Sequence, residues 1–78
     1  MATAKIVLDA STWTQVSDGT SLKTLQVTQG SVYLCDNPIT PSASSPAHIL
    51  YQGNIVVLTP PTIAWVKGIS VNSVVIVS

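Results

Sequence analysis

The chain has 78 residues, of which only 8% are charged, and its three lysines and three aspartates give a formal net charge of zero. An average soluble domain carries about 25% charged residues, so this chain is unusually poor in charge. Three separated lysines cannot form the basic stripe that follows a phosphate backbone, which argues against a nucleic-acid partner. The apolar runs are far shorter than the roughly 20 residues of a membrane-spanning helix, which argues against membrane insertion. We therefore expect a protein that is packed against other proteins.

The chain also lacks the crosslinks that stabilise many small domains. It contains one cysteine, Cys35, and one histidine, His48, so we expect neither an intramolecular disulfide nor a metal site, and no cofactor. Self-association remains as a source of stability for a domain with so thin a core, and we expect a homo-oligomer. The N-terminal residues show no signal-peptide pattern, which predicts synthesis in a reducing cytoplasm.

The first half of the chain is predicted to form a series of strands. Residues 1–10 are predicted to form an N-terminal arm or edge strand, and residues 11–78 a single β domain. Strand-forming residues are frequent, and no segment has a sustained helical period. Asp18-Gly19 predicts a tight hairpin turn. The strands predicted in this half are Lys5–Leu8, Thr12–Val16, Leu22–Thr28 and Ser31–Cys35.

The second half begins with a long irregular segment, Asp36–Pro46, which we call the main loop. Its three prolines and its serine-rich run predict the absence of regular structure. Loops of this length in a small domain are usually functional or mobile. Pro60-Pro61 predicts a second corner, because proline cannot donate to a strand ladder. The strands predicted in this half are His48–Tyr51, Ile55–Leu58, Thr62–Lys67 and Val71–Val77.

About seven short, mostly antiparallel strands, with turns every ~8–12 residues, predict an all-β fold, either a small β-sandwich or a barrel. Leu25 and Val27 should lie on one face of their strand, with polar residues on the other. Ile55–Leu58 and Val74–Val77 are apolar on both faces instead. A domain with one core leaves one such face uncovered, so we expect that face to contact another subunit. The simpler alternative is that a thin sheet exposes some valine.

The chain offers few groups for catalysis. His48 is the only candidate general base, with Asp36 or Asp9 to orient it and Ser31 or Cys35 as the nucleophile. Nothing in the spacing groups these residues, and the aspartates lack the patterns of paired carboxylates or of a calcium loop. We therefore expect a protein that is not an enzyme, in which Cys35 is a small buried residue.

Trp13, Tyr33, Tyr51 and Trp65 are the only large aromatic residues. Exposed rings beside polar groups would favour a carbohydrate-binding surface, whereas buried rings would belong to the core. We expect Trp65 in the core, because apolar residues flank it. Trp13 lies between two threonines and leaves both alternatives open.

Four segments together resemble a known class of proteins. They are Trp13–Thr20, Ser31–Leu34, His48–Gly53 and Ile63–Gly68, with a Pro/Ser/Ala-rich loop before the third and a valine-rich strand after the fourth. In the order of these segments the chain resembles the small β-domains of tailed-bacteriophage virion proteins. The resemblance implies a structural role, as a head decoration or cement protein or as a head–tail or fibre-base component. It also implies a trimer or higher oligomer.

On this basis we expect a virion protein, made in the host cytoplasm, that binds the major capsid protein or another virion protein and neighbouring copies, with a trimer favoured. Such binding would stabilise the particle. The alternative is a tail or fibre module that binds a host receptor or glycan. Residues 2–9 are expected to add a strand to a neighbour if they form an arm. The predicted contact residues are Asn37, Pro38, Ile39, Thr40, Pro41 and Pro46 in the main loop, and Pro60 and Pro61 at a second tip.

Overall fold

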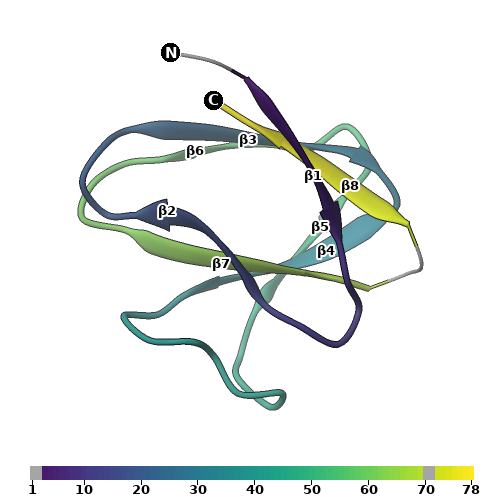
Figure 1. Cartoon of the computed structure of the whole chain (residues 1–78), viewed down its shortest axis with the longest axis horizontal. Helices are drawn as coiled ribbons and strands as arrows, with labels where there is room; N and C mark the ends of the chain where they lie inside the picture. Colours follow the sequence, from purple (N-terminus) through teal and green to yellow (C-terminus); the bar gives the residue numbers. More distant parts are fainter. Residues whose placement is uncertain (1–2, 70–71) are drawn as a thin grey trace.

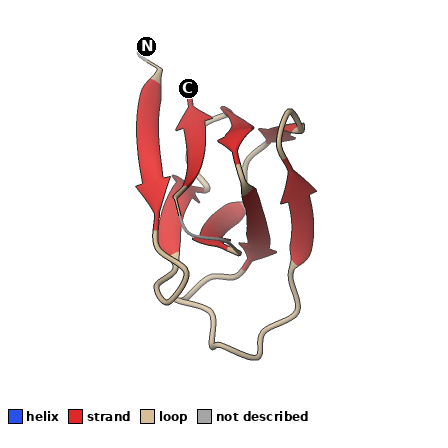
Figure 2. Ribbon diagram, turned by 90° about the vertical axis from the view of Figure 1, so that its right-hand side faces the viewer, coloured by secondary structure: helices blue, strands red, loops and turns tan. Residues whose placement is uncertain are grey.

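The computed structural model describes residues 3–69 and 72–78, and these residues form eight strands in two antiparallel four-stranded sheets (Figures 1 and 2). The sheets pack face to face as a β-sandwich, which confirms the predicted all-β fold. The first sheet has the order β1 (Ala4–Leu8), β8 (Ser73–Val77), β3 (Lys23–Gln29) and β6 (Ile55–Leu58). The second has the order β2 (Thr14–Asp18), β7 (Ile63–Gly68), β4 (Ser31–Asp36) and β5 (His48–Tyr51).

Each of the eight predicted strand ranges overlaps one strand of the sandwich, and the N-terminal segment forms an edge strand of its own sheet. β1 forms one edge of the first sheet and pairs with β8 along its whole length, from Ala4 opposite Val77 to Leu8 opposite Ser73. The buried side chain of Leu8 belongs to the hydrophobic core. The predicted start of the last strand, Val71, lies outside the described residues.

The core lies between the two sheets and follows the expected alternation of apolar residues. In β3, Leu25 and Val27 have no exposed surface, and Thr24 and Gln26 lie on the opposite face, as predicted. Successive side chains of a strand point to opposite faces, so alternate residues of a strand can face the core. The buried cluster consists of Leu8, Val16, Leu25, Val27, Val32, Leu34, Leu58, Ala64, Val66, Val75 and Val77.

The predicted hairpin at Asp18-Gly19 is wrong. β2 pairs with β7 in the second sheet, whereas β3 pairs with β6 and β8 in the first. The turn therefore carries the chain from one sheet to the other. β2 also begins and ends two residues later than expected, at Thr14 and Asp18. A glycine-containing turn fixes a change of direction, but long-range contacts choose the strand that each neighbour pairs with.

Two turns at the left end of the sandwich in Figure 1 pack against each other: the β2–β3 turn and the β6–β7 turn. The hydroxyl of Ser17 donates to the carbonyl oxygen of Thr62 at 2.9 Å. Gly19 has a φ of +85°, and a Cβ atom there would lie 2.9 Å from the carbonyl oxygen of Pro61. Pro61 follows a cis peptide bond from Pro60. Only glycine fits this contact without displacing one of the turns.

Acid should weaken two of the loops, because hydrogen bonds to Ser11 lower the pKa of Asp9 and hydrogen bonds to Thr20 lower the pKa of Asp18. A carboxyl group with a lower pKa in the folded state stabilises the fold above its unfolded pKa, and this stabilisation disappears as the pH falls through the folded pKa. We expect the free energy of unfolding, measured in urea, to fall below about pH 4. The Asp9→Asn/Asp18→Asn variant should show a smaller fall, and an equal fall would contradict this assignment.

Candidate functional site

Trp65 lies on the outer face of the second sheet, so its predicted place in the core is wrong. Its neighbours in β7, Ala64 and Val66, are buried in the core, and strand alternation turns the Trp65 side chain the opposite way. Apolar flanking residues suggested burial, but they occupy the inner face themselves. Trp65 is half-buried because the main loop returns over this face.

The main loop is held on the outer face by both tryptophans. The indole N–H of Trp65 donates to the carbonyl oxygen of Asn37 at 2.8 Å, and that of Trp13 donates to the carbonyl oxygen of Ser42 at 3.3 Å. Pro41, between these two anchors, is buried. Cys35 is buried as predicted, but it lies outside the core cluster, in β4 opposite Trp65. The loop thus covers part of the second sheet as a structured layer.

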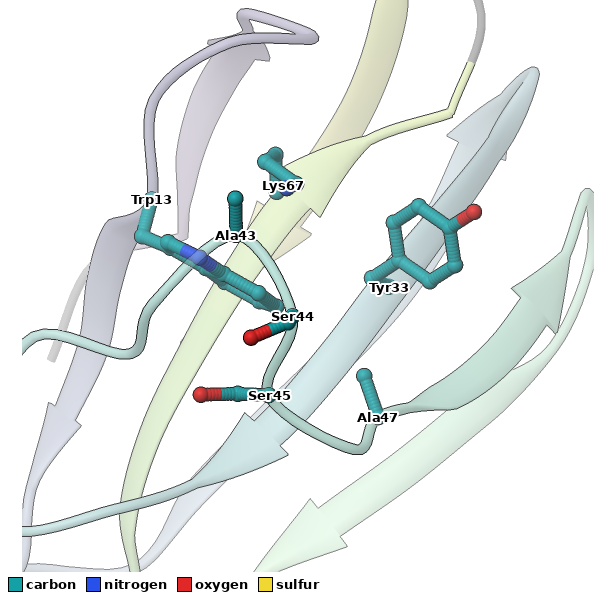
Figure 3. A pocket seen from close by; sticks show the side chains of 7 residues that line it. All are labelled: Trp13, Tyr33, Ala43, Ser44, Ser45, Ala47 and Lys67. Carbon is teal, nitrogen blue, oxygen red and sulfur yellow. The ribbon is translucent and has the colours of Figure 1, made fainter.

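Between this loop and the sheet is an open pocket of about 260 Å³, which we call the aromatic pocket (Figure 3). Lys67 projects from β7 and Tyr33 from the paired position of β4, while Trp13 immediately precedes β2. The Nζ atom of Lys67 lies 4.8 Å from the centroid of the Trp13 ring and 5.7 Å from the centroid of the Tyr33 ring. The complete lining is Trp13, Tyr33, Ala43, Ser44, Ser45, Ala47 and Lys67.

Sequence reasoning missed Lys67 as part of any site, because a single lysine carries no motif. A signal was present in the alternation of β7: once Ala64 and Val66 are assigned to the core, Trp65 and Lys67 fall on the same outer face. The pairing of Lys67 with Tyr33 depends on the register between β7 and β4. No local pattern gives that register.

The predicted contact residues differ in their exposure to solvent. Ile39 is 72% exposed, the largest exposed fraction among the large hydrophobic side chains described. Asn37 is half-buried, and its carbonyl oxygen accepts the hydrogen bond from Trp65. Pro41 is buried and cannot reach a partner in this conformation. The prolines at the second tip lie in the β6–β7 turn, and the main loop runs away from that turn along the second sheet (Figure 1). The exposed members of the predicted set are Pro38, Ile39, Thr40, Pro46, Pro60 and Pro61.

Three of the five groups considered for catalysis lie near one another, and Asp9 and Ser31 lie elsewhere. Cys35, Asp36 and His48 line one shallow depression. The register places His48 opposite Leu34, so alternation turns the Cys35 side chain to the other face of the sheet. A carboxylate oxygen of Asp36 accepts from the backbone N–H of Ile63 at 3.3 Å. Within residues 3–69 and 72–78, no three His, Cys, Asp or Glu side chains gather as metal ligands.

One side of the sandwich is notably apolar and uncharged. It consists of β5, β6 and the turn between them, residues His48–Leu58, and we call it the β5–β6 edge. Each of these strands is an edge strand of its sheet, and the segment contains no Lys, Arg, Asp or Glu. The other two edge strands each carry a charged residue, Lys5 in β1 and Asp18 in β2. The large hydrophobic side chains that the β5–β6 edge exposes are Ile49, Tyr51, Ile55 and Val57.

The described part of the chain contains no helix long and apolar enough to cross a membrane. Comparison with models of known protein families and with curated proteins finds no match to this chain.

Proposed function

We propose that this chain is a non-enzymatic structural component of a bacteriophage virion that binds neighbouring copies of itself and the capsid shell. The observation that carries the proposal is the β5–β6 edge. Ile55 is 61% exposed on β6, which pairs with β3 on one side and has no partner strand among the described residues on the other. Proteins that remain monomeric usually protect such edges with charged residues, and this segment has none.

The occupant we propose for the β5–β6 edge is a second copy of the chain. Pairing of edge strands would continue a sheet from one copy into the next and would cover Ile55 and Val57. The low charge of the chain supports this arrangement, because like charges would not accumulate as copies come together. The exposed Ile39 in the main loop is then free to contact the shell.

Light scattering coupled to gel filtration tests the self-association. We expect a mass that is a multiple of the 8.2 kDa of one chain, with a trimer favoured. Ile55→Lys should shift the mass toward that of a single chain without unfolding the domain, because the side chain points to solvent and lysine is a common protector of edge strands. Gln15→Lys adds the same charge at an exposed position of β2, in the other sheet, and should leave the oligomer intact.

A wild-type chain that stays monomeric up to roughly millimolar concentration would overturn the self-association, because an association this weak is worth only about 4 kcal/mol. The virion location needs a separate measurement. Mass spectrometry of particles purified after infection with the phage that encodes this chain should detect it at many copies per particle. Its absence from intact particles would overturn the structural role even if the free chain forms oligomers.

A further inference from the structure

The aromatic pocket holds a lysine ammonium group that has no carboxylate beside it within residues 3–69 and 72–78. The atoms found around Nζ of Lys67 are the rings of Trp13 and Tyr33, at 4.8 and 5.7 Å. The three aspartate carboxylates are bonded elsewhere: Asp9 to Ser11, Asp18 to Thr20 and Asp36 to the backbone of Ile63. Ring faces attract the positive charge but accept no conventional hydrogen bond, so the ammonium N–H groups keep their capacity for oxygen acceptors.

The rings also fix the position of this cation. A free lysine side chain loses substantial rotamer freedom when it is ordered, and that loss opposes ligand binding. Here Trp13 and Tyr33 flank Lys67 before any ligand arrives, and the indole of Trp13 is itself bonded to the main loop through Ser42. Part of the ordering is therefore complete in the unliganded fold.

The main loop and the first residue after it line the pocket with four small residues, Ala43, Ser44, Ser45 and Ala47. The hydroxyl groups of Ser44 and Ser45 both lie within hydrogen-bonding distance of the Ser42 hydroxyl, at 3.3 and 3.1 Å. The Ser45 hydroxyl also accepts from the backbone N–H of Ser42 at 2.9 Å. A hydroxyl donates once and accepts twice, so each serine keeps at least one position for a ligand. Figure 3 shows the two serines on the loop beside the Trp13 ring, with their hydroxyl groups directed away from Tyr33 and the Tyr33 hydroxyl directed away from the loop.

We propose that the aromatic pocket binds the carboxylate-bearing ring of an acidic monosaccharide. The carboxylate would bind Lys67 as a charge-assisted pair, the sugar hydroxyls would bind Ser44 and Ser45, and the apolar face of the sugar would lie on the aromatic side chains. One cation matches one carboxylate, whereas a phosphate site would normally add an arginine or several backbone N–H groups.

The size of the pocket sets the size of the ligand. Its volume is about 260 Å³, below the roughly 300–1,000 Å³ of pockets for drug-sized ligands. A single sugar ring is the unit that it accommodates, either free or at the end of a polysaccharide. The site would give the chain a second activity at the particle surface, and it does not depend on self-association.

Titration of the protein with small ligands, monitored by ¹⁵N NMR, tests the site. The indole N–H signal of Trp13 is the reporter. Sodium glucuronate should shift this signal, and glucose and acetate should bind about tenfold more weakly, since each lacks one half of the recognised chemistry. Lys67→Met should weaken glucuronate binding by about tenfold while keeping the aliphatic stem against the rings. Lys5→Met, which removes an exposed lysine from β1, is the matched control and should bind as the wild type does.

Several outcomes would overturn the proposal: no shift at tens of millimolar glucuronate, equal binding of glucose or acetate, or unchanged binding by Lys67→Met. The comparison of the three ligands on the wild-type chain stands even if a variant fails to fold. Binding of an oligosaccharide that ends in glucuronate shows whether the natural ligand is the end of a polysaccharide or the free sugar acid. Tighter binding than that of the free sugar indicates a polysaccharide end, and equal binding indicates the free acid.

Discussion

Leu25→Ala is expected to lower the free energy of unfolding by about 2–5 kcal/mol. Leu25 has no exposed surface and belongs to β3, the strand that pairs with both β6 and β8. Removal of its side chain would leave a cavity at the centre of the core, where the paired strands on both sides prevent collapse. A domain this small has a total stability of only a few kcal/mol, so the variant should be largely unfolded near 37 °C.

Leu22→Ala is the matched control for this substitution. Leu22 is 50% exposed and precedes β3, so the same atoms are removed from a position that is already partly hydrated. Its expected cost is below about 1 kcal/mol. Urea unfolding followed by tryptophan fluorescence measures both variants. Equal costs would show that the core is not organised around β3 as described.

Gly19→Ala is expected to lower the free energy of unfolding by about 2–4 kcal/mol. A residue with a side chain is strained at the φ of +85° found there. The added Cβ would also lie 2.9 Å from the carbonyl oxygen of Pro61 and 3.1 Å from Cγ1 of Ile63. Relief of these contacts requires the β2–β3 and β6–β7 turns to separate, which would stretch the bond from Ser17 to Thr62.

Gly53→Ala separates the cost of backbone strain from the cost of the contacts between the two turns. Gly53 has a similar φ of +93°, but nothing lies within 4 Å of the Cβ position. Its cost should be the backbone strain alone, about 1–2 kcal/mol. The difference between the two variants, measured by urea unfolding, then reports the contact between the turns. A Gly53→Ala cost that equals or exceeds the Gly19→Ala cost would contradict this packing.

The β5–β6 edge and the aromatic pocket adjoin each other in the second sheet, so one substitution can affect both. Ile49 of the β5–β6 edge pairs with Tyr33, which lines the aromatic pocket. A substitution at Ile49 would therefore disturb both surfaces at once. Ile55 belongs to the other sheet, so Ile55→Lys changes self-association and leaves the pocket lining in place. Sugar binding by this variant should match that of the wild type.

The sequence alone determined the local features of this protein. Alternation placed Leu25 and Val27 on the core face of β3, and β5 and β6 have the predicted bounds, His48–Tyr51 and Ile55–Leu58. The all-β class and the burial of Cys35 were also predictable. These features depend on the side-chain period of a strand and on the chemistry of turns, both of which act over a few residues.

The tertiary structure decided which strands meet and what covers them. The Asp18-Gly19 turn has hairpin chemistry, yet it joins two sheets, because β2 finds its partner in β7 far along the chain. Trp65 is apolar and flanked by core residues, yet it faces outward under the main loop. The aromatic pocket exists only because the register pairs Tyr33 with Lys67 and the loop returns over them. Pairing and register minimise the free energy of the whole chain, so no short segment contains them.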